Sequence, residues 1–256
     1  MEKIIAALWA PPHEPREDYG ARLLTSLPQA LHAAGARGIR LNIRDSVVAP
    51  GEALVQQWQN PQQAAVAQFW LPSANARFRA GIDAVLAAHS AWFAAWLVCE
   101  STIIANTAHP PRPSGPACAT RTWGWSQASF IAFRPDLSRD AVIEHWHGHH
   151  TRVAIETQAN FEYVQNLIVR PLTPGAPAYG AFVEECFPLA ALDQPEAFFD
   201  AVGNPAKFKA NLDAMMESCH AFLDFTRNDI IPTSQYDYAF LDATASEGPP
   251  QAKDHA

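Results

Sequence analysis

The sequence is short of charge, and the charge that it has is mostly acidic. Charged residues make up 17% of the 256 residues, and 26 acidic against 18 basic side chains give a net charge of -8. A nucleic-acid binder needs clustered Lys and Arg to neutralise phosphates. We therefore expect no nucleic-acid partner.

Long apolar runs are also missing. A membrane helix needs about 18 unbroken apolar residues, and the nearest approach, at 84–99, is interrupted by His89 and Ser90. The apolar N-terminal stretch stops at Pro11 and Pro12, which makes it too short for a signal peptide. We therefore expect a cytoplasmic protein without a membrane partner.

Cofactor and disulfide motifs are absent as well. The four cysteines form no C-x-x-C pair, which argues against a structural zinc site, and a chain of this size does not need disulfides. The sequence contains no G-x-G-x-x-G, no P-loop and no G-x-S-x-G elbow. We therefore expect no organic cofactor, and neither a nucleotide-dependent enzyme nor a serine hydrolase.

What the sequence does have is proline, gathered near its middle. The segment 109–121 is rich in proline, which fixes φ and lacks an N–H, so this stretch is neither helix nor central strand. We interpret it as a linker between a first unit at 1–108 and a second unit at 122–241. The polar tail at 242–256 has the composition of a disordered segment.

Apolar periodicity predicts the same order of elements in both units. In the first unit, the predicted strands are 4–9, 39–48 and 64–71, and the predicted helices are 17–34 and 76–104. In the second unit, the predicted strands are 127–133, 163–169 and 179–187, and the predicted helices are 136–157 and 208–225.

The repeated order β-α-β-β-α, with a final strand to follow, is that of a ferredoxin-like unit. We therefore predict an α+β fold in which two ferredoxin-like repeats, related by internal duplication, stack their sheets into one barrel. Stacking hides the apolar face that each sheet would otherwise expose. It also leaves room for a ligand cavity between sheet and helix.

A histidine-rich helix is the segment most suggestive of chemistry. At about 100° per residue, Trp146 lies on the apolar stripe of the helix, and His149 and His150 lie on the borders of that stripe. Burial lowers the pKa of an imidazole and favours its neutral, basic form. His150 is therefore a candidate general base or acid, and a histidine that only fills the core is the alternative.

A metal site on the same helix is a further alternative. His145 and His149 have the i, i+4 spacing of paired zinc ligands. No carboxylate pattern such as H-E-x-x-H accompanies them, so we expect no metal here.

The second unit resembles the EthD-like members of the dimeric α+β barrel superfamily. The resemblance is carried by the strand at 130–133, by Trp146 with three residues between it and His150, and by the strand that begins at Tyr163. The strand at 179–187 is similar to the family's following strand, which carries an acidic residue. The resemblance runs from 125 to about 240.

The first unit resembles the fold but lacks the motif, because Tyr19 stands where Trp146 would and Leu23 where His150 would. The resemblance thus implies a degenerate, structural first half and an acid–base role for His150. The superfamily includes cofactor-free monooxygenases, polyketide cyclases, dehydratases, decarboxylases, isomerases and haem enzymes. EthD-like members act on aromatic and ether-containing small molecules, and the fold alone does not select the reaction.

Strand alternation does not decide which residues of these strands face the cavity. Tyr163 and Asn166 lie on opposite faces of their strand, so only one of them points into a cavity between sheet and helix. Glu184 and Glu185 likewise lie on opposite faces, and the enclosed one would be an acid with a raised pKa. The candidate catalytic residues are His150 and His149, and the candidate substrate-binding residues are Trp146, Tyr163, Asn166, Trp125, Tyr179 and Glu184.

Three hypotheses follow for function. The first is a cofactor-independent lyase, in which His150 moves a proton while water, carbon dioxide or an aldehyde fragment leaves an apolar aromatic molecule. The second is a cofactor-free monooxygenase of a phenolic substrate, with a haem-dependent variant. The third is a binding protein for a hydrophobic compound. A barrel formed within one chain needs no second subunit to close it. A homodimer formed through the outer surface of the barrel is still an alternative.

Overall fold

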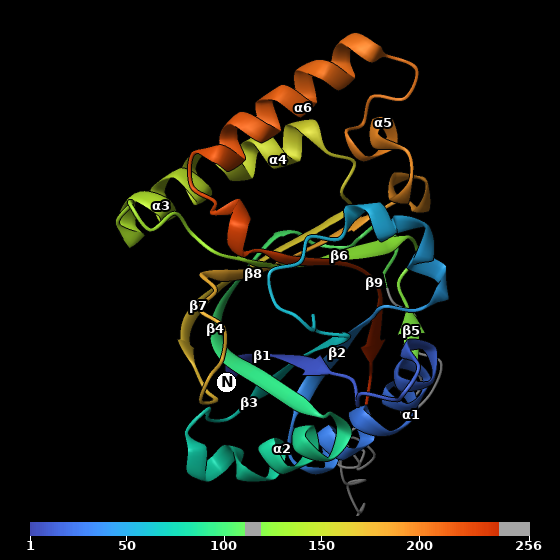
Figure 1. The fold of residues 1–256 in the computed structure, drawn as a ribbon, viewed down its shortest axis with the longest axis vertical. Coiled ribbons are helices and arrows are strands. Elements are labelled where there is room, and N and C mark those ends of the chain that lie inside the picture. The colour runs from blue at the N-terminus through green and yellow to red at the C-terminus, as the bar shows by residue number, and fades with distance from the viewer. Residues whose placement is uncertain (111–118, 241–256) are drawn as a thin grey trace, which may run out of the picture.

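Eight strands close into an antiparallel barrel in the computed structural model, which describes residues 1–110 and 119–240 (Figure 1). Around the barrel the strands are β2 (Arg37–Ile43), β3 (Ala65–Leu71), β1 (Glu2–Trp9), β4 (Trp92–Ile104), β7 (Glu162–Pro171), β8 (Ala181–Phe187), β6 (Trp125–Ile131) and β9 (Asp229–Tyr238). β9 pairs with β2 and closes the ring. A short strand, β5 (Ala119–Arg121), extends the β6 side by pairing with the end of β9.

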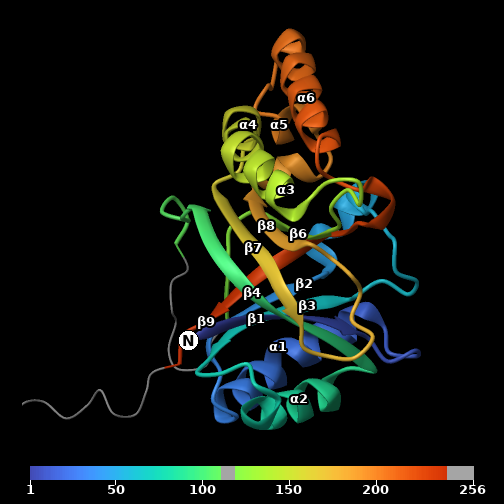
Figure 2. The same cartoon turned by 90° about the vertical axis from the view of Figure 1, so that its left-hand side faces the viewer.

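Helices cover the barrel on two opposite sides (Figures 1 and 2). The first layer is α1 (Arg16–Ala33) and α2 (Ala76–His89). The second layer is α3 (Arg139–His145), the π-helical turn η2 (Trp146–His150), α4 (Thr151–Thr157) and α6 (Pro205–His220). Shorter helical segments lie between these elements: η1 (Ser46–Leu54), η3 (Leu189–Leu192), α5 (Pro195–Phe198) and η4 (Phe225–Arg227).

The four main strands of each half lie in the same spatial order. Along the barrel the first half runs β2-β3-β1-β4 and the second runs β7-β8-β6-β9, so in both halves the second strand is followed by the third, the first and the fourth. The halves join where β4 pairs with β7 and where β9 pairs with β2.

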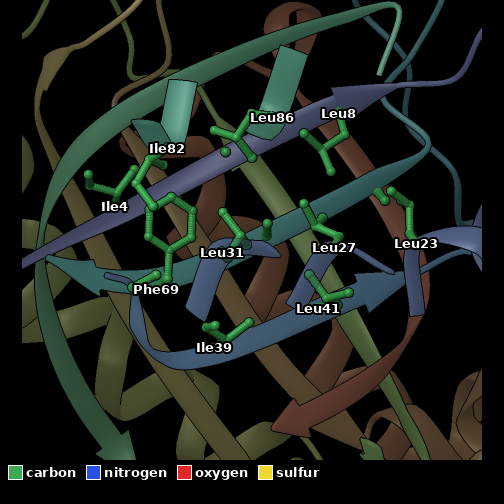
Figure 3. Packing of buried hydrophobic residues seen from close by; sticks show 14 of the residues in the cluster. Ile4, Leu8, Leu23, Leu27, Leu31, Ile39, Leu41, Phe69, Ile82 and Leu86 are labelled. Carbon is green, nitrogen blue, oxygen red and sulfur yellow. The ribbon is translucent and has the colours of Figure 1, made fainter. Parts of the chain in front are cut away.

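Strand alternation explains why β1 is apolar almost throughout. Ile4 and Leu8 pack under α1 and α2 with Leu27 and Leu31, as Figure 3 shows. Ile5, between them, points into the barrel interior. A strand that is covered on both faces reads as a continuous hydrophobic run.

Part of the barrel interior is charged. The Arg40 guanidinium contacts the carboxylates of Glu162, Glu184 and Asp237 at 2.6, 3.0 and 2.7 Å. An apolar cluster that includes Trp96, Phe130 and Phe182 fills another part of the interior. Packing and ion pairs therefore occupy the space enclosed by the strands.

The helix predicted over 76–104 is wrong in its second part. α2 ends at His89, and Trp92–Ile104 forms β4, which pairs with β1 and β7. Trp92 and Trp96 are four residues apart, a spacing that keeps side chains on one face of a helix and of a strand alike. In β4, Trp96 faces the barrel interior and Ala95 faces the first helix layer.

The predicted linker and tail lie partly outside the described residues, namely at 111–118 and 241–256. The last three residues of the predicted linker form β5. In the part of the chain that the structure describes, no helix is long and apolar enough to cross a membrane.

Candidate functional site

The histidine-rich helix is interrupted by a wide turn. Ser138 caps its N-terminus by accepting a hydrogen bond from the Ala141 N–H at 3.2 Å. The Thr151 N–H bonds the carbonyl of Trp146, five residues back, which is the mark of a π turn. Such turns are frequent at functional sites. This one encloses the indole of Trp146 and the imidazole of His150, which are both buried.

His149 lies outside this enclosure. The prediction placed it on the apolar stripe by assuming a regular rotation of about 100° per residue. A π turn spreads its residues over a wider ring and rotates less per residue. His149 is exposed, whereas His150 is 9% exposed.

His150 is held by two neighbours on the second helical layer. Its Nδ1 is 2.9 Å from the Ser218 hydroxyl of α6, and its ring centroid is 4.9 Å from that of Phe222. Phe222 also stacks on Trp146, with centroids 6.3 Å apart. Burial, with smaller contributions from nearby His145 and His149, lowers the pKa of His150 to about 4, so the ring is neutral at physiological pH.

Ser218 bonds only Nδ1 of His150, so the second ring nitrogen, Nε2, is available to a ligand. The Nε2 of His145 is 3.0 Å from the Ser218 carbonyl oxygen, which only accepts, so His145 carries a proton there. The Ser218 hydroxyl can donate to His150 Nδ1 or accept from it. In the part of the chain that the structure describes, Nε2 of His150 has no hydrogen-bond partner.

A row of three polar side chains crosses the sheet beneath this helix. Tyr163 of β7 and Gln127 of β6 are the direct cross-strand partners of Glu185 in β8. All three line one cavity. The Asn160 amide donates to the Glu185 carboxyl at 2.9 Å, but burial dominates and raises the pKa of Glu185 to about 7. Glu185 is therefore an acid that is largely protonated below pH 7.

Tyr163 is fixed beside Glu185. Gln165 donates to the Tyr163 hydroxyl at 2.7 Å and to Thr151 Oγ1 at 2.9 Å, which ties β7 to the helix just after the π turn. Burial raises the pKa of Tyr163, and the charge of Glu185 raises it further. The phenol therefore stays protonated and remains a hydrogen-bond donor.

The cavity has a volume of about 540 Å³. Its helix wall includes Trp146, His150 and Phe222, and its sheet wall includes Glu185. η1 of the first half and η3 with α5 of the second half close its sides. Met216 of α6 lies at its exposed rim.

Three of the predicted site residues meet in this cavity, namely Trp146, His150 and Tyr163. Trp125 is on the same face of the sheet but packs beyond them, with its ring 5.3 Å from that of Phe187.

Asn166, Tyr179 and Glu184 do not reach the cavity, because they lie on the barrel-facing side of the sheet. The Tyr179 hydroxyl donates to Asp229 at 2.6 Å. Both polar atoms of the Asn166 amide lack a hydrogen-bond partner within the described ranges.

Glu184 is an ion-pair residue of the barrel interior. Burial alone would raise its pKa, but Arg40 and the amides of Gln235, Asn42 and Gln68 stabilise the carboxylate and bring the pKa to about 2. A carboxylate held in this way is a poor proton donor. Of the two adjacent glutamates, Glu185 is the one in the cavity.

Several cavity residues were not among those predicted from the sequence. Ser129 and Asn228 on the sheet wall, Met215 and Cys219 on α6, and the η1 segment all line the cavity. The cysteine and methionine lie on one face of α6, where their sulfur atoms are 3.7 Å apart. Among the described residues, no group of three or more His, Cys, Asp or Glu side chains is arranged to hold a metal ion.

Comparisons with known proteins bear on this region. Residues 134–226 match the EthD domain, which confirms the resemblance for that part of the chain. An anthrone oxidase-like structure is 10% identical, with a TM-score of 0.46 over 93% of this chain and 90% of that chain. A chlorite dismutase-like structure is 9% identical, with a TM-score of 0.41 over 93% and 95%. No curated protein matches significantly.

Proposed function

We propose that the region matching the EthD domain, together with the strands and the η1 segment that complete its cavity, works as a lyase on an apolar aromatic small molecule. His150 is the proton acceptor and Glu185 is the proton donor, and the chemistry needs no organic cofactor. The observation that carries this proposal is that the two side chains line one cavity from opposite walls, one on the helix and one on the sheet.

The environments of the two groups assign their roles. His150 is buried beside Phe222 and is neutral above about pH 4, so its Nε2 has a free lone pair in the tautomer in which Nδ1–H donates to Ser218. Glu185 keeps its proton up to about pH 7. Two titratable groups whose pKa values are pushed apart in this way are typical of acid–base pairs.

Loss of water is the simplest reaction that uses both groups. His150 takes a proton from carbon, and the electron pair of the broken C–H bond forms the new C=C bond. The C–O bond breaks on the neighbouring carbon, and the departing oxygen takes the proton of Glu185 and leaves as water. Return of the His150 proton to the Glu185 carboxylate, directly or through solvent, restores the enzyme.

The walls favour an aromatic substrate. Phe222, Phe199, Leu54, Val183 and Ile131 surround the reacting groups. Apolar walls bury aromatic rings and exclude water, which strengthens the electrostatic interactions inside.

We also infer that the chain arose from two ferredoxin-like repeats, and that the first is a structural partner. The identical strand order in the two halves supports this inference. The first half closes the barrel and contributes η1 to the cavity, while Tyr19 and Leu23 are buried in its own core.

The proposal is tested by incubating the protein with a panel of hydroxylated aromatic compounds and measuring mass loss. Turnover should be the same with and without oxygen, which separates a lyase from a monooxygenase. His150→Gln and Glu185→Gln should each lower turnover by about 10²–10⁴-fold, whereas His149→Gln, the exposed neighbour, should retain it. Turnover that requires oxygen, or that stays within a few fold of wild type in His150→Gln, would remove the lyase assignment.

A further inference from the structure

Two buried side chains on the sheet side of the cavity have hydrogen-bond donors without a partner, and on the helix side the acceptor Gln158 Oε1 is also unpaired among the described residues. Within the described residues, Asn228 Nδ2 and Ser129 Oγ have no partner. Asn228 is 2% exposed and Ser129 is 4% exposed, and both line the cavity. A buried polar atom without a partner loses its hydration and gains nothing in return, so the two atoms point to a ligand group that completes them.

The orientation of the Asn228 amide is fixed by the backbone. The Ala132 N–H donates to Asn228 Oδ1 at 3.0 Å, so the acceptor end of the amide is occupied. The donor end, Nδ2, has no partner. Because the bond to Oδ1 fixes the amide, Asn228 presents an N–H donor in a defined orientation.

Strand register brings Ser129 to the same region. Ser129 of β6 pairs with Ile230 of β9, two residues after Asn228, and Ile230 also lines the cavity. Ile131, two residues along β6, is a further apolar neighbour on this wall. These two apolar side chains cannot accept a hydrogen bond, and no other described residue accepts one from either donor, so a bound molecule can supply the acceptor.

The charge of the cavity limits that molecule. None of the described residues that line the cavity is Lys or Arg. A carboxylate or phosphate would need such a cation or several donors when it leaves water. An amide N–H and a hydroxyl together donate two hydrogen bonds, which suits a neutral acceptor. A carbonyl oxygen is a neutral acceptor that takes two hydrogen bonds.

We infer that the substrate is an uncharged aromatic ketone, whose carbonyl oxygen is bound by Asn228 Nδ2 and Ser129 Oγ. This inference rests on the proposed lyase function and names its substrate class. The subsite lies beside the row of three polar side chains that contains Glu185, because Ser129 is two residues from Gln127, the cross-strand partner of Glu185. Two residues along a strand span about 7 Å, which is comparable to a substituted aromatic ring.

The subsite also has a part in the reaction. A carbonyl makes the adjacent C–H bond acidic. When His150 removes that proton, the electron pair moves through the new C=C bond onto the carbonyl oxygen as an enolate. The two hydrogen bonds then stabilise the developing negative charge, as donors do in an oxyanion hole. Collapse of the enolate expels the β-oxygen with the proton of Glu185, and the ketone carbonyl re-forms.

The test is a binding measurement that needs no turnover. We compare 1-tetralone with tetralin, which has a methylene in place of the carbonyl, by isothermal titration calorimetry. Wild type should bind the ketone about tenfold more tightly, since two hydrogen bonds of about threefold each amount to that factor. Asn228→Asp keeps the acceptor for Ala132 and removes the N–H donor, and Ser129→Ala removes the hydroxyl.

Each variant should reduce the preference for the ketone to about threefold while leaving tetralin affinity nearly unchanged. Asn166→Asp is the matched control, because that buried asparagine also has an unpaired amide but faces the barrel interior. Equal binding of the two compounds by wild type, no binding of either, or equal weakening of both in the variants would overturn the subsite. Ketone selectivity without turnover on any aromatic ketone would keep the subsite and remove the lyase.

Discussion

Glu184 and Glu185 are consecutive residues of β8 on opposite faces of the sheet, and their environments push their pKa values in opposite directions. Arg40 and amide donors hold the pKa of Glu184 at about 2 against the effect of burial, whereas burial raises that of Glu185 to about 7. One strand thus supplies an ion-pair residue to the barrel interior and a protonated acid to the cavity.

This contrast predicts opposite effects of pH on stability. Glu184 has a lowered folded pKa, so it stabilises the fold above pH 4.5, and that stabilisation is lost as pH falls towards 2. Glu185 has a raised folded pKa, so its contribution is complete below pH 4.5 and is lost as pH rises through 7. A difference of about 2.5 pKa units corresponds to about 3 kcal/mol in each case.

Denaturant unfolding of two variants measures both effects. Glu184→Gln should be less stable than wild type at pH 7 by about 3 kcal/mol, and the deficit should shrink below pH 4. Glu185→Gln should gain about 3 kcal/mol relative to wild type between pH 4 and pH 8. Identical pH dependence in the two variants would contradict the placement of these glutamates.

The two neighbouring histidines should differ in their effect on rate. His150→Gln removes the proton acceptor, and general base catalysis contributes 10²–10⁴-fold, so kcat/KM should fall by that order. His149→Gln changes an exposed ring and should leave kcat/KM within twofold. Steady-state kinetics on the same substrate, with melting temperatures to check folding, make the comparison. Equal losses in both variants would place the base elsewhere on the helix.

Ser218 should act by positioning His150. Ser218→Ala removes the hydroxyl that bonds Nδ1. The imidazole of His150 can then rotate, so that it is less often oriented to accept the substrate proton. We expect kcat to fall roughly fivefold with KM nearly unchanged, since one hydrogen bond is worth about 1 kcal/mol. Ser218→Thr keeps the hydroxyl and should restore most of the rate. A change confined to KM would show that Ser218 serves binding instead.

Gly51 should set the position of the η1 wall. A Cβ built on Gly51 would lie 2.6 Å from Leu192 Cδ2 and 3.1 Å from Pro232 Cγ, so in Gly51→Ala the Leu192 side chain or η1 itself must shift, and either shift changes this wall of the cavity. We expect KM to rise several-fold while kcat changes little. Gly81→Ala on α2, where an added Cβ meets nothing within 4 Å, is the matched control. A normal KM in Gly51→Ala would mean that η1 does not shape the substrate site.

Much of the fold could be predicted from the sequence, because most of the predicted strands and helices carry a clear periodic signal. The strand at Ile4–Trp9, the helix ending near Gly35 and the EthD-like segment around His150 were all recognisable. The strand β4 was not, because residues four apart share a face in both helix and strand. The surrounding strands β1 and β7, which pair with it, decide the outcome.

The site was harder to predict, because it depends on which face of its strand or helix each side chain occupies. It also depends on contacts between residues that are far apart in the sequence. Alternation alone could not decide between Glu184 and Glu185, and the structure decides it through the register with Tyr163. His149 was misplaced because a π turn leaves no signal in a 100° pattern. The cavity role of η1 depends on contact between the two halves of the chain, which no local pattern records.

The pH dependence of kcat/KM tests the central claim most directly. The free enzyme should be active when His150 is neutral and Glu185 is protonated. The profile should therefore rise through about pH 4, stay level, and fall through about pH 7. A rate that keeps rising above pH 7, or that stays flat from pH 4 to pH 9, would contradict an acid–base pair formed by His150 and Glu185.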